Sequence, residues 1–163
     1  MIILGIDPGL ATIGYGVIEA KSRISLVEYG IIQTLPTSTL PERLEIIFKN
    51  IDLLIKDFNP DEVAIEELFF NKNVKTAITV GEARGVILVS LKLNSVPIYE
   101  YTPLQIKSSI AGYGRAEKLQ VQNQVKNILS LKDIPKPDDA SDALAVAMTH
   151  YFQGRNKEMF LIK

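Results

Sequence analysis

The sequence has no cysteine, only one histidine, His150, and almost no net charge. The lack of cysteine excludes a disulfide framework and a cysteine nucleophile, and it is compatible with a reducing compartment. A formal net charge of −1 does not fit binding to nucleic acid through bulk charge, so such binding must depend on local clusters of Lys and Arg. Long apolar runs are also missing. The first run ends at Asp7, too early for a signal peptide or a membrane span, and we expect a cytoplasmic location.

What the chain does contain is the composition of an ordinary globular protein. Its 163 residues are 47% apolar and 23% charged, and they show no internal repeat or low-complexity tract. A chain of this length buries about 70% of its unfolded surface when it folds. We therefore expect a single domain over residues 1–163.

Apolar patterns along the chain predict strands first and then strands that alternate with helices. The predicted strands are residues 2–6, 14–20, 25–33, 62–66 and 96–101. The predicted helices are residues 41–58, 74–93, 103–111, 117–129 and about 138–154, with Pro and Gly at several of their ends. The first three strands favour an antiparallel meander. The whole order predicts an α/β fold, a mixed five-stranded sheet with helices on its faces.

Acidic side chains stand at the ends of three of these predicted elements. Asp7 closes the first strand, Glu66 and Glu67 close the fourth, and the last helix begins with Asp138 and Asp139, followed by Asp142. Positions three or four apart on a helix share a face, so two acids of this helix can point into one site. The alternatives are structural: Asp-Pro-Gly makes a good turn, and acids stabilise a helix N-terminus.

The chemical interpretation of these acids is a site for a hard cation. Mg²⁺ takes oxygen ligands, and carboxylates together with substrate phosphate oxygens commonly hold it. Two such ions about 3.5 to 4 Å apart can activate a water and stabilise a leaving oxygen in phosphodiester hydrolysis. His150 lies about 12 Å from Asp142 along a helix, by the 1.5 Å rise per residue, so we do not expect it to join this site.

Five segments, taken together, resemble one known family. They are GIDPG followed by GYGVI (5–18), AIEELF (64–69), NKN with GEARGV (71–86), AEKLQVQ (116–122) and DASDALAVAMTH (139–150). In this order and spacing the sequence resembles the RuvC family of bacterial Holliday-junction resolvases, in the ribonuclease-H-like superfamily. The resemblance covers about residues 2–152. It implies a structure-specific, metal-dependent endonuclease of recombination and DNA repair whose paired nicks leave 5′-phosphate and 3′-hydroxyl ends.

The resemblance also implies which acids are catalytic. The family's catalytic and metal-binding carboxylates fall on Asp7, Glu66, Asp139 and Asp142. The match selects Glu66 over its neighbour and Asp139 over Asp138, which becomes an additional acid beside the site. The implied cofactor is Mg²⁺, two ions per active site, for which Mn²⁺ can substitute.

The same resemblance implies the contacts with DNA and the partners. The expected substrate is four-way junction DNA, cut by a homodimer, and the RuvA–RuvB branch-migration complex is a candidate partner. Small residues spaced by four along the predicted helix 74–93 would let another helix approach closely, either within the same domain or from a second copy, and the resemblance favours the second copy. The expected DNA-binding residues are Phe69, which would approach the junction bases, Lys107 and Lys118 near the scissile phosphate, and the basic residues Lys72 and Arg115.

Three other functions are compatible with parts of this pattern. Another ribonuclease-H-like nuclease that acts on RNA or linear duplex would use the same metal chemistry. A phosphotransferase of the actin and sugar-kinase superfamily also opens with a strand, an aspartate and a Gly-rich turn, but 163 residues leave little room for the second domain it needs. A non-catalytic junction-binding module would not need the full set of four acids.

Overall fold

Five strands form one mixed sheet in the computed structural model, which describes residues 1–68 and 74–162 apart from the side chains of residues 74–76 and 155. The strands are β1 (Ile2–Asp7), β2 (Thr12–Ala20), β3 (Ile24–Gln33), β4 (Glu62–Glu66) and β5 (Ile98–Tyr101). They lie in the order β3-β2-β1-β4-β5. The first three strands pair antiparallel, whereas β1, β4 and β5 run parallel. The predicted meander and mixed sheet are therefore confirmed, with β1 in the centre.

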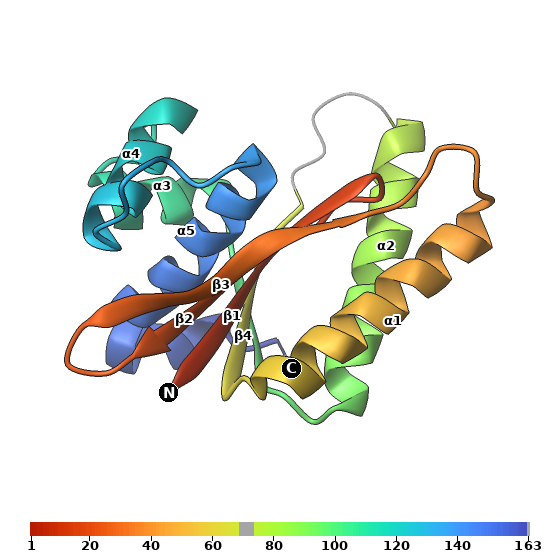
Figure 1. The fold of residues 1–163 in the computed structure, drawn as a ribbon, viewed down its shortest axis with the longest axis horizontal. Coiled ribbons are helices and arrows are strands. Elements are labelled where there is room, and N and C mark those ends of the chain that lie inside the picture. Colours follow the sequence, from red (N-terminus) through yellow and green to blue (C-terminus); the bar gives the residue numbers. More distant parts are fainter. Residues whose placement is uncertain (69–73, 163) are drawn as a thin grey trace.

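Helices cover both faces of this sheet (Figure 1). One face carries α1 (Leu40–Phe58) and α2 (Val74–Leu93), and the other carries α3 (Pro103–Ala111), α4 (Lys118–Ile128) and α5 (Asp138–Gln153). Each face has its own cluster of buried apolar side chains. The predicted bounds of all five helices agree with these to within one residue at each end. Within the described residues, no helix is both long and apolar enough to cross a membrane.

Local signals in the sequence explain where helices begin and end. Thr39 precedes α1 and forms a capping box with Glu42, whose carboxylate accepts a hydrogen bond from the Thr39 amide at 2.7 Å. Thr102 caps α3 in the same way, and its hydroxyl accepts from the amide of Gln105 at 3.2 Å. The helix ends at Gly112, whose φ of 86° lies in the left-handed region that favours glycine.

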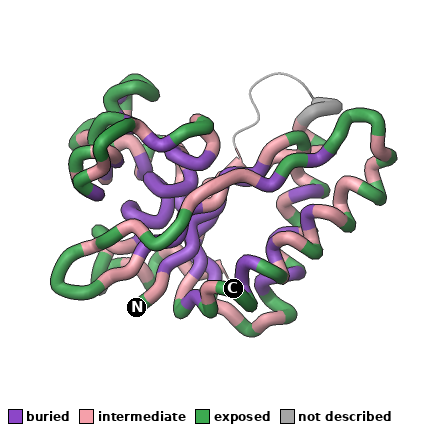
Figure 2. The backbone as a smooth tube through the Cα atoms, in the orientation of Figure 1, coloured by how far each residue is buried: buried purple, intermediate pink, exposed green. Residues whose placement is uncertain are grey.

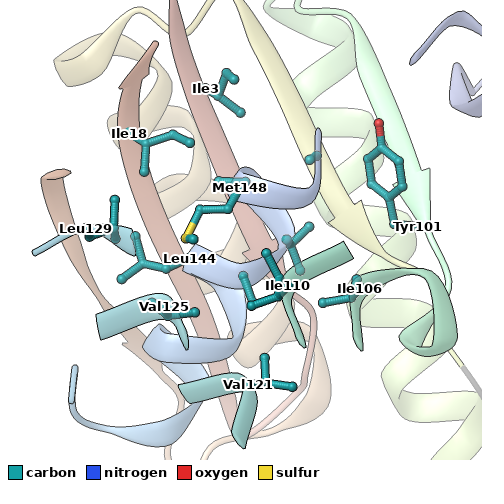
Figure 3. Close-up of a cluster of buried hydrophobic side chains, with 14 of the residues drawn as sticks. Ile3, Ile18, Tyr101, Ile106, Ile110, Val121, Val125, Leu129, Leu144 and Met148 are labelled. Carbon is teal, nitrogen blue, oxygen red and sulfur yellow. The ribbon is translucent and has the colours of Figure 1, made fainter. Parts of the chain in front are cut away.

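The most deeply buried helix is α5. From Ala140 to His150, every residue except Asp142 is buried (Figure 2). In the core, Leu144 and Met148 of this helix lie between side chains of the sheet and those of α3 and α4 (Figure 3). Full burial of one such side chain contributes about 1.5 to 3 kcal/mol. The helix that carries two of the predicted catalytic acids is thus held firmly against the sheet.

Two features differ from the sequence-based expectation. The fifth strand begins at Ile98 rather than at residue 96, because Pro97 has no N–H to donate to a neighbouring strand. The tail, for which the sequence predicts no structure, forms the 3₁₀ helix η1 (Gly154–Phe160) and returns to the sheet. There the amide of Ile162 donates to the carbonyl of Ile98 at 2.9 Å, which adds a short contact at the edge.

His150 lies near this tail, away from the predicted catalytic acids. Its Nδ1 lies 2.7 Å from the hydroxyl of Tyr101, and its Nε2 lies 2.7 Å from the carboxylate of Glu62. Glu62 is the first residue of β4, whereas Glu66 is the last. The histidine therefore contacts the opposite end of the strand from the acid cluster, as its spacing along the helix predicts.

Candidate active site

Two of the predicted catalytic acids end neighbouring parallel strands. Asp7 is the last residue of β1, and Glu66 is the last residue of β4. The strands are paired in register up to Ile6 and Ile65, so the two acids that follow emerge side by side at the same edge of the sheet. Both acids are half-buried. The sheet alone therefore brings together two carboxylates that are 59 residues apart in the sequence.

The other two predicted acids reach this edge because α5 touches the backbone of the sheet. Gly14 of β2 pairs with Asp7, and a Cβ built on this glycine would lie 1.9 Å from the carbonyl oxygen of Asp139. A Cβ on Gly5 would similarly lie 2.1 Å from the carbonyl oxygen of Ala143. Only glycine permits so close an approach. These contacts set the N-terminal turn of α5 directly beside the end of β1.

The acids repel one another in this setting. Burial raises the pKa of Asp7 to about 8, and the negative charges of the other three acids add to this shift. Burial also raises the pKa of Glu66 to about 7, with a further contribution from Asp142. The pKa of Asp142 is raised by burial as well, against the opposing effect of Lys118. Such a cluster needs positive charge close by before all its members can ionise at neutral pH.

Lys118 supplies part of that positive charge. Its Nζ lies 2.7 Å from Oδ2 of Asp142 and 3.9 Å from Oδ2 of Asp138. Asp138 itself pairs with Lys136 at 2.6 Å, which holds its pKa below the usual range, and its side chain is 46% exposed. Asp138 is therefore already neutralised by a lysine outside the acid cluster.

The neighbouring acid Glu67 points elsewhere. It lines a separate hollow with Arg84 and Glu100, which form an ion pair between α2 and β5. Glu66, in contrast, lines a cleft of about 190 Å³ together with Asp142. The placement of these side chains agrees with the choice of Glu66 that the motif implies.

The lining of the cleft beside Glu66 combines charged and apolar side chains. Lys107 and Lys118 line it together with the two carboxylates, and Lys118 is paired with Asp142. The apolar lining comes from α3, α4 and α5 and consists of Pro103, Ile106, Val121 and Ala145. Lys107 is half-buried, whereas Arg115 is exposed in the α3–α4 connection and is not among the described residues that line the cleft. Of the predicted basic contacts, Lys107 and Lys118 thus lie beside the acids, and Arg115 does not.

Two predicted DNA contacts, Phe69 and Lys72, lie outside the described residues. Sequence reasoning also left some site features out. It does not predict the close approach of α5 to Gly14 in the GYGVI segment, although a glycine inside a strand is a known sign of such an approach. It also overlooked Arg43 of α1, which shares a groove with Asp139.

The carboxylates are suited to divalent cations, since all four offer hard oxygen ligands in a region short of positive charge. As the side chains stand, no group of three or more His, Asp or Glu among the described residues is arranged to hold a metal ion. The Lys118 side chain is bonded to one of these acids. Coordination would therefore require the carboxylates to turn toward a common centre.

The strand order and the acids at the ends of two central strands define the ribonuclease-H-like class of nuclease folds. The family model described as "Crossover junction endodeoxyribonuclease RuvC" matches residues 3–150. The chain belongs to this family, the RuvC crossover junction endodeoxyribonucleases, and the Holliday-junction resolvase function expected from its motifs is confirmed.

Relatives and solved structures agree with this assignment. The chain is 57% identical over 151 residues to a RuvC of Clostridioides difficile, with 92% of this chain and 89% of the relative covered. It is 55% identical over 164 residues to a RuvC of Alkaliphilus oremlandii, and both chains are covered completely. The structure of T. thermophilus RuvC in complex with Holliday junction substrate superposes with a TM-score of 0.88, at 35% identity and 96% coverage of each chain. The kinase and binding-module alternatives are set aside.

Proposed function

We propose that residues 1–163 form a single nuclease domain that cuts four-way junction DNA at the edge of the sheet where Asp7, Glu66, Asp139 and Asp142 stand. The observation that carries this proposal is the convergence of the acids from β1, β4 and α5, where burial raises the pKa of Asp7 to about 8 and that of Glu66 to about 7. So much desolvated negative charge is costly unless cations bind it. A structural cap would not need acids from three elements.

The four carboxylates would hold two Mg²⁺ ions, for which Mn²⁺ can substitute. When bound, such ions supply Lewis-acid stabilisation of phosphoryl oxygens and an activated water for hydrolysis. The products would carry 5′-phosphate and 3′-hydroxyl ends.

The lysines of the cleft would bind the DNA beside the cut. Lys107 and Lys118 line the cleft beside the carboxylates, so a phosphate placed there would meet their positive charge. The apolar lining, which includes Ile106 and Val121, would keep water away from the far side of the nucleotide. Arg115, which does not line the cleft, and the predicted contacts Lys72 and Phe69 would bind the junction arms and bases. Stacking on one base contributes about 1 to 3 kcal/mol.

A homodimer would place two such sites on one junction. Along α2, a Cβ on Gly81 or Gly85 would meet nothing within 4 Å in the described structure, and Ile78 and Val89 nearby are more than half exposed. Packing among the described residues therefore does not use this face. We infer that this face of α2 contacts a second copy of the chain. We also infer that the enzyme is cytoplasmic. Docking onto the RuvA–RuvB complex stays a prediction from the resemblance.

Substrate and metal dependence can be tested together. A synthetic four-way junction, a linear duplex and an RNA/DNA hybrid of the same sequence are incubated with the chain in Mg²⁺ or in EDTA. We expect paired, symmetric nicks that require Mg²⁺ and are confined to the junction. Equal cutting of the duplex or hybrid would keep the metal site and contradict the proposed substrate. Cutting in EDTA would contradict the metal chemistry.

A further inference from the structure

A second groove lies on the other side of the acid cluster from the lysines. It measures about 450 Å³ and lies between the β1–β2 connection, the first turns of α1 and the N-terminal half of α2. Its polar lining includes Arg43, Asp139 and Thr12. The cleft with Lys107 and Lys118 is lined mainly by residues of α3, α4 and α5. These helices lie on the opposite face of the sheet from α1 and α2 (Figure 1). The acid cluster therefore lies between two grooves. Glu66 and Asp142 line the cleft with the lysines, and Asp139 lines the groove with Arg43.

Arg43 is held in place in this second groove. Its Nε donates to the hydroxyl of Thr34 at 2.8 Å, and that hydroxyl donates to the carbonyl of Leu10 at 2.6 Å. Leu10 belongs to the turn that follows Asp7. The guanidinium is thus fixed through its inner nitrogen and tied to the loop beside the first catalytic acid. Its terminal nitrogens remain available for a ligand.

These terminal nitrogens have no anionic partner within the part of the chain that the structure describes. None of the ion pairs found there includes Arg43, although the half-buried Arg84 is paired with Glu100. Arg43 is itself only half exposed. Its terminal nitrogens are not among the buried atoms that lack a partner, so a ligand can reach them from solvent. Its planar fork matches the oxygens of a phosphate.

We propose that Arg43 binds a backbone phosphate of the DNA strand on the α1 side of the scissile position. The inference rests on the proposed function, because it places the cut at the four carboxylates. The strand would then meet positive charge on both sides of the acids, from Lys107 and Lys118 in the cleft and from Arg43 in the groove. Through Thr34 and Leu10, the same contact supports the turn after Asp7.

The test uses four-way junctions in which single phosphates near the cut are replaced, one at a time, by uncharged methylphosphonate linkages. Binding of the native chain and of Arg43→Gln is measured in EDTA. We expect Arg43→Gln to weaken binding of the unmodified junction about tenfold and to reduce the slope of log K against log salt by about 1. At one linkage, neutralisation should weaken binding of the native chain by a similar factor and leave the variant unaffected.

Controls separate this contact from general effects. Arg23→Gln removes a charge from the exposed β2–β3 turn, at the end of β2 away from Asp7, and should bind like the native chain. Arg43→Lys keeps the charge without the fork and should show a partial loss, which also tests the proposal if the Gln variant does not fold.

Two results would overturn the inference. One is native affinity in Arg43→Gln, and the other is a set of methylphosphonate penalties that add to the Arg43→Gln penalty at every linkage. Both concern binding in EDTA. A failure of the proposed function would instead appear as unchanged cutting by Asp7→Asn, so the two can be told apart.

Discussion

Gly14→Ala tests whether the approach of α5 to the sheet builds the active site. The substitution adds one methyl group to β2, at the position paired with Asp7. That carbon would lie 1.9 Å from the carbonyl oxygen and 2.4 Å from the carbonyl carbon of Asp139, and both of these are backbone atoms. No side chain can rotate to relieve the overlap. The first turn of α5 must therefore move away from the strand.

The size of the effect follows from that overlap. A Cβ essentially never lies closer than 3.0 Å to such an atom, so the turn must move by about 1 Å. Overpacking of this kind costs about 1 to 3 kcal/mol, or more where backbone resists. A displacement of about 1 Å at a catalytic group can lower the rate about a hundredfold. We expect a moderate loss of stability and a much larger loss of cutting.

The assay compares two variants of the same strand. Gly16→Ala is the matched control with a smaller overlap, because its Cβ would lie 2.7 Å from the side chain and 2.9 Å from the backbone nitrogen of Leu144, compared with 1.9 Å at Gly14. The free energy of unfolding is measured with denaturant, and single-turnover junction cutting is measured where each variant is folded. Gly16→Ala should lose less stability than Gly14→Ala and keep most of its activity. Native cutting rates in folded Gly14→Ala would refute the reasoning.

Three other predictions follow from the same site. Asp139→Asn should lower junction cutting by more than the roughly 10- to 100-fold loss that is typical when a residue behind a metal ligand is changed. Asp138→Asn removes an acid that is paired with Lys136, and it should have a smaller effect. The reverse order would show that the wrong acid was chosen. In EDTA, thermal stability should fall as pH rises from about 4 to 8, because the raised pKa of Asp7 means that the folded chain holds a proton there that the unfolded chain has released. Asp7→Asn should flatten this dependence, and a native-like slope in the variant would contradict it. Gly85→Leu should dissociate the dimer in sedimentation experiments while the monomer stays folded, since a side chain there meets nothing within the described chain; an intact dimer would move the interface elsewhere.

Much of the fold could be predicted because its signals are local. Prolines and capping residues such as Thr102 mark helix starts, and the parallel arrangement of β1 and β4 follows from the helix between them. The tail could not be predicted in this way. Residues after Gly154 have no periodic pattern, and they are ordered by distant contacts with β5, such as the amide of Ile162 on the carbonyl of Ile98.

The site shows the same division. Asp7 can be recognised as a candidate site residue from a single sequence. A carboxylate at the end of a buried strand is costly to desolvate, so its presence there suggests a function. The choice between Asp138 and Asp139 cannot be made from local signals, since both begin the same helix. In the structure Asp138 pairs with Lys136, whereas the backbone of Asp139 lies against Gly14. Arg43 gave no signal at all, because an arginine near a helix start is ordinarily a surface charge until its neighbours are known.

The most direct test of the account is the cutting of a four-way junction by Asp7→Asn in Mg²⁺, with junction binding measured beside it. Asparagine keeps nearly the same shape but removes the charge and one metal-binding oxygen. The account predicts that the variant binds junctions at least as well as the native chain and makes no paired nicks. Cutting by the variant at the native rate would contradict the assignment of this carboxylate cluster as the catalytic centre.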